Sequence, residues 1–153
     1  MKILIIEDEI SKEQRIIDFL HETFPSAKII AKHSVMAGKD AINEDHFDYI
    51  LLDMSLPLFD YSDVGVWHND SNEFETFGGL AILDEMDRCR SKSKVIVITA
   101  FDILGDGKHR ISLQDLDAQM KSDYQELVIK SIFYDSSSVE WREEIRSTIV
   151  QNL

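Results

Sequence analysis

The sequence has little cysteine and no long apolar run. Cys89 is the single cysteine among 153 residues, so no disulfide can form within the chain, which fits a reducing compartment. The apolar stretch at residues 3–6 is far too short for a signal peptide or a membrane span, and an acidic triplet follows it. These absences predict a cytoplasmic protein without membrane insertion.

Basic residues are also scarce, with 16 Lys and Arg against 29 Asp and Glu and a formal net charge of −13. Such a surface repels phosphate backbones and anionic lipid head groups, which argues against direct nucleic-acid binding. The acidic excess either serves solvation or forms a docking face for a basic protein partner. With 44% hydrophobic residues, the composition is that of a globular protein, and the length fits one domain.

Short apolar runs alternate with helical patterns along the chain. Strands are predicted at residues 2–6, 27–31, 49–52, 95–98 and 127–129. Helices are predicted at residues 11–24, 34–43, 80–89 and 112–120 and around Trp141, Ile145 and Ile149. Ser11 with Gln14, and Ser112 with Asp115, have capping-box spacing. The alternation predicts a doubly wound α/β fold, a parallel sheet covered by helices on both faces.

Chemically active side chains stand where the predicted strands end. Glu7 and Asp8 follow the first strand, Asp53 the third, Thr99 the fourth and Lys130 the fifth. Ligands of open parallel sheets bind outside the carboxyl ends of the strands, so these residues are expected to share one site. A hard divalent cation such as Mg²⁺ relieves the repulsion among clustered carboxylates. An aspartate there can also act as a nucleophile and form an acyl phosphate.

Four segments contain these strand-end residues: ILIIEDE at residues 3–9, YILLDMSLP at 49–57, VIVITA at 95–100 and LVIK at 127–130. Together they resemble the receiver domains of two-component response regulators. The resemblance spans nearly the whole chain and implies a single receiver domain over residues 1–153, with strand order 2-1-3-4-5.

The resemblance also implies a role for each residue of the site. Asp53 is the expected phosphoacceptor, with Thr99 and Lys130 contacting the phosphoryl oxygens. The Mg²⁺ ligands that it implies are Asp8, Asp53, the backbone carbonyl of Ser55 and, through water, Glu7.

The implied function is that of a stand-alone receiver, which takes a phosphoryl group and signals by binding a downstream protein partner. The expected donor is a histidine kinase or a histidine phosphotransfer protein. Such a receiver phosphorylates and dephosphorylates itself and is not a multiple-turnover enzyme. One alternative is a non-phosphorylated receiver-like interaction module. Another is a phosphatase with an aspartate nucleophile, disfavoured because Ser55 stands where that chemistry needs a second acid.

Two segments are longer than in typical receivers. An insertion at residues 58–77 carries the aromatic residues Phe59, Tyr61, Trp67, Phe74 and Phe77. It is interpreted as a packed loop or as a docking element or gate beside Asp53, and the interaction-module alternative assigns the binding to it. Residues 101–111 form a lengthened loop with a flexible turn at its two glycines.

Smaller departures concern the coupling of phosphorylation to the surface. Leu127 stands where receivers usually have an aromatic residue, which predicts that an aromatic switch is absent or moved to Tyr124. Ser131 replaces the usual proline after the lysine, which disfavours a cis peptide bond there. Phe101, two residues after Thr99, is expected to shield the acyl phosphate from hydrolysis.

Overall fold

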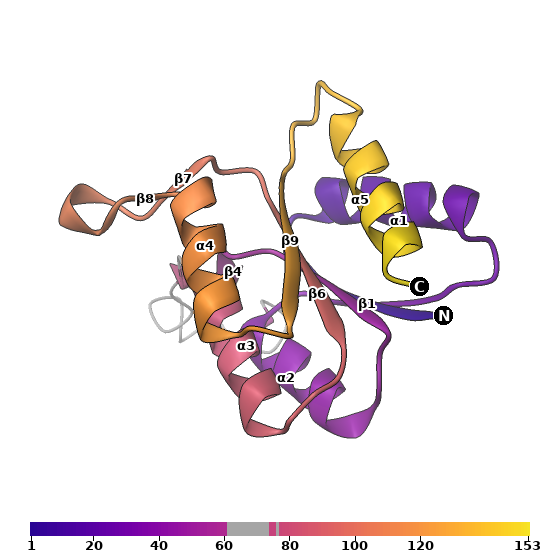
Figure 1. Cartoon of the computed structure of the whole chain (residues 1–153), viewed down its shortest axis with the longest axis horizontal. Helices are drawn as coiled ribbons and strands as arrows, with labels where there is room; N and C mark the ends of the chain where they lie inside the picture. The colour runs from indigo at the N-terminus through magenta and orange to yellow at the C-terminus, as the bar shows by residue number, and fades with distance from the viewer. Residues whose placement is uncertain (61–73, 76) are drawn as a thin grey trace.

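A parallel sheet forms the centre of the computed structural model, which describes residues 1–60, 74–75 and 77–153. Its strands are β1 (Lys2–Ile6), β2 (Lys28–Lys32), β3 (Tyr49–Leu52), β6 (Lys94–Thr99) and β9 (Val128–Phe133). They lie in the order β2-β1-β3-β6-β9 (Figure 1), which is 2-1-3-4-5 when the five strands are numbered along the chain. The predicted fold class and strand order are therefore confirmed.

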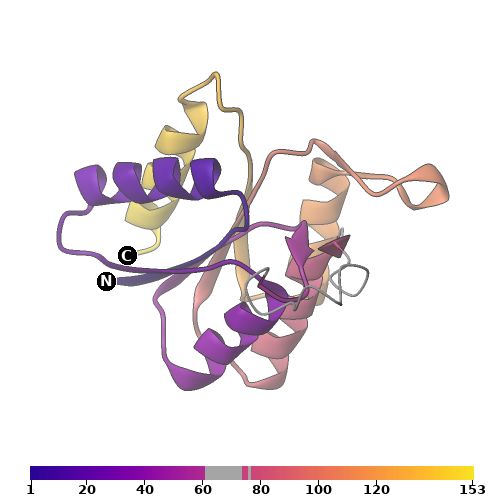
Figure 2. The ribbon, with the colours of Figure 1, turned by 180° about the vertical axis from the view of Figure 1, so that it is seen from behind.

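Helices cover both faces of the sheet. Two of them, α1 (Ile10–Thr23) and α5 (Glu140–Gln151), lie side by side on one face, as Figures 1 and 2 show from opposite sides. The other face is covered by α2 (Val35–Glu44), α3 (Gly78–Arg88) and α4 (Leu113–Asp123), which lie across the sheet from α1 and α5 in Figure 1. In the described part of the chain, no helix is long and apolar enough to cross a membrane.

Two apolar layers hold the helices to the sheet. Successive side chains of a strand point to opposite faces, so Ile3 and Ile5 pack under α1 and α5 while Leu4 and Ile6 pack under α2 and α3. Because both faces of the sheet are covered, its inner strands are apolar at nearly every position. This explains why β1, β3 and β6 could be predicted as continuous apolar runs.

One of the two predicted capping boxes is wrong. The backbone N–H of Asp115 donates to the Ser112 hydroxyl at 3.1 Å, which confirms that Ser112 caps α4. Helix α1 instead begins at Ile10, directly after Glu9, and the Ser11 hydroxyl donates to the Glu9 carboxylate at 2.8 Å. The third residue of α1 is therefore Lys12, close to the end of β1.

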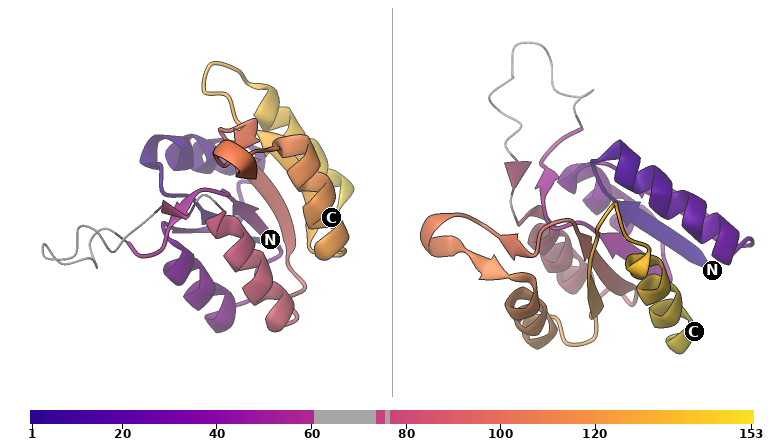
Figure 3. Two further views of the ribbon diagram at one scale, coloured as in Figure 1. Left: turned by 90° about the vertical axis from the view of Figure 1, so that its left-hand side faces the viewer. Right: turned by 90° about the horizontal axis from the view of Figure 1, so that it is seen from above.

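The lengthened loop after Thr99 contains a hairpin that was not predicted. Strands β7 (Ile103–Leu104) and β8 (Ile111–Ser112) pair antiparallel and carry a short 3₁₀ helix at Gly107–His109. Gly105 and Gly107 have φ angles of 84° and 51°, a left-handed conformation that glycine adopts readily. The hairpin projects away from the body of the molecule in Figures 1, 2 and 3.

A second short pairing lies at the base of the predicted insertion. Strand β4 (Leu56–Pro57), which follows the end of β3, pairs antiparallel with β5 (Phe74–Glu75), just before α3. Residues 61–73 and 76 lie outside the described residues, and Tyr61 and Trp67 are among them.

The end of the last strand differs from the prediction. Strand β9 does not end at Lys130 but continues to Phe133, which pairs with Thr99 at the end of β6. Lys130 pairs with Ile96 and is therefore an interior residue of the strand. Lys130 and Ser131 were interpreted as the end of an apolar run, although a strand at the edge of a sheet tolerates polar side chains facing solvent.

Candidate functional site

A cavity of about 390 Å³ opens at the carboxyl ends of β1, β3 and β6. This is the edge of a parallel sheet where ligands of such folds bind. The described residues that line it are Glu7, Asp8, Glu9, Lys12, Asp53, Ser55, Ala100 and Phe101.

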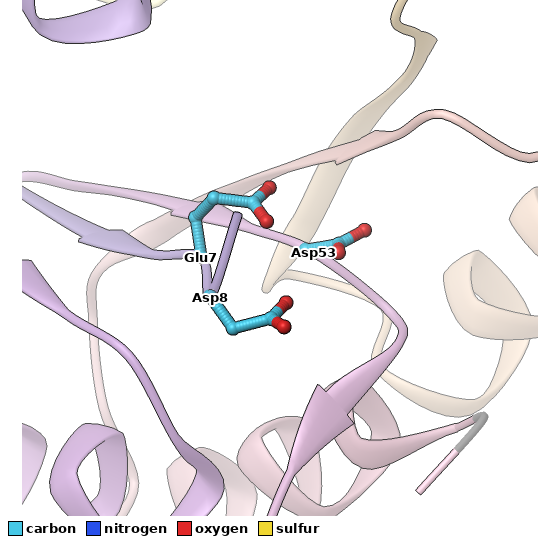
Figure 4. A group of neighbouring side chains, drawn as sticks. All are labelled: Glu7, Asp8 and Asp53. Carbon is cyan, nitrogen blue, oxygen red and sulfur yellow. The ribbon is translucent and has the colours of Figure 1, made fainter. Parts of the chain in front are cut away.

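Three carboxylates meet in this cavity. Oxygen atoms of Glu7, Asp8 and Asp53 lie within 4.8 Å of one another, and Figure 4 shows the three side chains at the adjoining ends of β1 and β3. The backbone N–H of Asp53 donates to the carbonyl of Ile6 at 3.0 Å, which ties the end of β3 to the end of β1. The predicted convergence of these acids is thus present in the structure.

A lysine that was not predicted as a site residue lies among them. Lys12 of α1 is 1% exposed, and its Nζ lies 2.5 Å from Oε2 of Glu7 and 3.4 Å from Oδ1 of Asp53. The same ammonium donates to the carbonyl of Ile98 at 2.9 Å and lies 5.6 Å from the centroid of the Tyr134 ring. The described lining of the cavity contains no other cationic side chain.

The sequence holds a signal for Lys12. It precedes Ile16 and Leu20 at intervals of four residues, so it lies on the helix face that packs on the sheet. A cation in the first turn of a helix also opposes the helix dipole, which makes an isolated lysine unfavourable there. Both features indicate a lysine with buried anionic partners.

Burial shapes the ionisation of the acids. It raises the pKa of Glu7 to about 7, with a further contribution from the charge of Asp53, although the Lys12 ammonium acts in the opposite direction. Burial also raises the pKa of Asp8 to about 6, and the neighbouring Glu7 adds to this shift. The pKa of Asp53 is raised by burial too, against the effects of Lys12 and of the Met54 N–H, which donates to Asp53 at 2.9 Å. A bound cation would favour the charged form of all three.

Two further predicted residues lie nearby. Ser55 lines the cavity beside Asp53. Thr99 ends β6 and is completely buried, with its hydroxyl oxygen accepting a hydrogen bond from the backbone N–H of Phe101 at 3.3 Å. Phe101 lines the same cavity, and the residue is 54% exposed.

Lys130 does not join this group in the structure. Its Nζ lies 3.5 Å from Oε2 of Glu144 on α5, and the side chain is 44% exposed. The physical reason is the continued strand, because Lys130 lies three residues before Phe133, which pairs with Thr99. Tyr124 does not line the cavity either. It follows directly after α4, and its hydroxyl donates a hydrogen bond to Asp84 of α3.

A 2-1-3-4-5 parallel sheet with acids gathered at the ends of its first and third strands defines the fold of response-regulator receiver domains. The resemblance noted in the sequence is confirmed at this level.

Comparisons with known proteins agree with this class. No protein-family model matches the chain. It is 24% identical to the Detocs response regulatory protein DtcB of Enterobacter cloacae over 152 residues, 99% of each chain. It is 25% identical over 149 residues to the uncharacterized protein y4jR of Sinorhizobium fredii, covering 96% of this chain and 95% of that protein.

Solved structures of receivers superpose on nearly the whole chain. A CheY-like receiver domain protein of Methanospirillum hungatei has a TM-score of 0.62 at 17% identity, with 98% of this chain and 94% of that chain covered. The response regulator TrrA of Thermotoga maritima, solved in complex with Mg²⁺ and beryllofluoride, has a TM-score of 0.58 at 15% identity, with 96% and 97% covered.

Proposed function

We propose that residues 1–153 act as one receiver domain, which accepts a phosphoryl group on Asp53 in a Mg²⁺-dependent reaction. The observation that carries this proposal is the convergence of Glu7, Asp8 and Asp53, with oxygens within 4.8 Å, at the carboxyl ends of two adjacent parallel strands. A signalling receiver is also what the fold and the response-regulator relative support.

The residues present fit a Mg²⁺ ion. Buried Glu7 and Asp53 and half-buried Asp8, all with raised pKa values, provide an all-oxygen donor set that a hard cation would stabilise, and Mg²⁺ binds such carboxylates while keeping several waters. Asp8, Asp53 and the Ser55 carbonyl would bind the ion directly, and Glu7 through water. When bound, Mg²⁺ supplies positive charge that stabilises the phosphoryl oxygens during transfer.

Asp53 would act as the nucleophile. One of its carboxylate oxygens forms a bond to phosphorus while the bond between phosphorus and the donor's leaving group breaks. With a phosphohistidine donor, the leaving imidazole takes up a proton. Thr99, at the end of β6, would then donate its hydroxyl to a phosphoryl oxygen, which requires the buried side chain to turn toward the cavity.

The donor in this proposal is a histidine kinase or a histidine phosphotransfer protein, and the signal is read by a protein partner. The net charge of −13 favours a partner whose docking face is basic. Binding would depend on the phosphorylated state through a change at the end of β6.

Incubation with acetyl phosphate and Mg²⁺, followed by intact-mass measurement, tests this function. The wild-type protein should gain one phosphoryl group, and Asp53→Asn should gain none. Asp87→Asn, which removes an exposed carboxylate on α3, is the matched control and should behave as wild type. A wild-type protein that stays unmodified with acetyl phosphate and with beryllofluoride favours the interaction module instead, and repeated turnover of phosphate esters favours the phosphatase.

A further inference from the structure

We propose that Lys12, and not Lys130, is the lysine that contacts the phosphoryl group on Asp53. This inference rests on the function proposed above and names a residue of the same site. It assigns to a helix residue the role that the sequence resemblance gave to a residue of the last strand.

The position of the Lys12 ammonium carries the inference. Its Nζ lies 2.5 Å from Oε2 of Glu7, 2.9 Å from the carbonyl oxygen of Ile98 and 3.4 Å from Oδ1 of Asp53, so each of its three N–H groups has an oxygen within reach. The two shorter contacts, with Glu7 and the Ile98 carbonyl, hold the ammonium in place. The longest contact is with Asp53, the proposed phosphoacceptor. When the phosphoryl group joins Asp53, the third N–H can bond a phosphoryl oxygen while the other two contacts persist.

A purely structural ion pair between Lys12 and Glu7 does not explain all the contacts of Lys12. Burying a lysine and a glutamate together carries a large desolvation cost, which their attraction offsets only with good geometry. A structural pair would need no second carboxylate, yet Lys12 also lies 3.4 Å from Asp53 inside the cavity. A cation already fixed beside the reacting group can stabilise the transition state without reorganisation.

The end of β9 complements this arrangement. The chain after Phe133 carries Tyr134, whose ring lies 5.6 Å from the Lys12 ammonium. An aromatic face favours a nearby cation, so the residue that follows the last strand stabilises the ammonium of Lys12 beside Asp53. Tyr134 is in turn packed on Trp141 of α5, with ring centroids 5.2 Å apart.

A crystal structure of the wild-type protein with Mg²⁺ and beryllofluoride tests the inference without a mutation. Lys12 Nζ should lie about 3 Å from a fluorine atom, the distance of a charge-assisted hydrogen bond, while Lys130 stays beside Glu144. The inference is overturned if Lys130 contacts the fluorine atoms in this complex, or if Lys12 contacts Glu7 and no fluorine atom. Failure of the wild-type protein to form any adduct counts against the proposed function instead.

Variants give an independent test. Lys12→Met should slow phosphorylation by acetyl phosphate about 100-fold or more, the effect of removing one charge-stabilising donor. Lys130→Met, which removes a half-exposed lysine, is the matched control and should phosphorylate as wild type. The reverse ranking of the two variants overturns the inference.

A fold defect in Lys12→Met is separated from a chemical one by Mg²⁺ binding. Removing the ammonium frees the carboxylates, so the variant should bind Mg²⁺ more tightly than wild type while accepting phosphate more slowly. Trp141 fluorescence is a suitable reporter, because Trp141 packs on Tyr134 beside Lys12. Weaker Mg²⁺ binding in a folded variant contradicts the inference, and the beryllofluoride complex decides the matter if the variant does not fold.

Discussion

At the scale of single residues, Glu7 makes stability depend on pH. Its pKa rises from 4.5 to about 7 on folding because the carboxyl is buried. The native protein therefore binds more protons than the unfolded chain between these values, and its stability falls as pH rises through that window. At about 1.4 kcal/mol per pKa unit, the loss attributable to Glu7 is at most on the order of 3 kcal/mol.

Thermal melts of wild type and Glu7→Gln between pH 4.5 and 7.5, without divalent metal, check this prediction. The wild-type melting temperature should fall relative to that of the variant as pH rises. Asp8, whose pKa is raised from 3.8 to about 6, adds an effect of the same sign that is smaller in Glu7→Gln, because the Glu7 charge contributes to that shift. A difference between the two proteins that is independent of pH would contradict the assigned ionisation.

Gly79 has no side chain, and this allows α3 to lie close to the end of β3. A Cβ at this position would lie 2.8 Å from the carbonyl oxygen of Asp53 and would overlap the Met54 methyl group. The Gly79 N–H also donates to the Met54 carbonyl at 3.0 Å, so the helix cannot shift without moving the backbone that carries Asp53.

We therefore expect Gly79→Ala to cost about 1–3 kcal/mol, as overpacking does, and to weaken Mg²⁺ binding. Gly38→Ala on α2 is the matched control, because its Cβ would meet the flexible ends of Ile6 and Ile82 at 2.8 and 2.9 Å. Urea unfolding and a Mg²⁺ titration measure both effects. Equal losses of stability and equal Mg²⁺ affinities in the two variants would show that the backbone near Asp53 is not constrained by Gly79.

At the scale of elements, the β7–β8 hairpin is anchored by one of two adjacent side chains. Leu104 is 2% exposed and belongs to the core under α2, α3 and α4, whereas Ile103 is 45% exposed. Leu104→Ala should therefore cost about 2–5 kcal/mol, and Ile103→Ala about 0.5 kcal/mol or less. Denaturant unfolding of both variants measures this contrast, and similar costs would mean that the hairpin does not dock as described.

The elements differ in how far the sequence determines them. Strand β3 has the bounds that were predicted, because an apolar run buried on both faces ends directly at Asp53. Strand β9 was predicted to end too early, at Lys130, because polar residues within an edge strand resemble the end of an apolar run. The hairpin was missed because each of its strands is two residues long, too short for a periodic pattern.

The same contrast applies to the site. Glu7, Asp8 and Asp53 could be predicted to lie together, because these acids come directly after apolar strands and parallel strands align their carboxyl ends. The lysine could not be assigned by this route. Lys12 lies in the first turn of α1, and its partners depend on how α1 is rotated about its axis relative to the sheet. The sequence does not give this rotation.

At the scale of the whole molecule, a net charge of −13 acts together with the acidic cavity. Any salt screens the repulsion among surface carboxylates and should raise the melting temperature slightly. A specific Mg²⁺ site adds about 2.7 kcal/mol at a concentration 100 times its Kd. For a chain of this size that corresponds to about 5–10 °C beyond the effect of general screening.

Melting curves in Mg²⁺ and in NaCl of matched ionic strength separate these contributions. Wild type should be stabilised more by Mg²⁺ than by NaCl, because only Mg²⁺ neutralises the three carboxylates whose pKa values are raised by burial. Asp8→Asn should keep the NaCl response, which belongs to the surface as a whole, and lose the additional Mg²⁺ response. If both salts stabilise wild type equally, Mg²⁺ acts only through the overall charge and the acidic cavity is not a metal site.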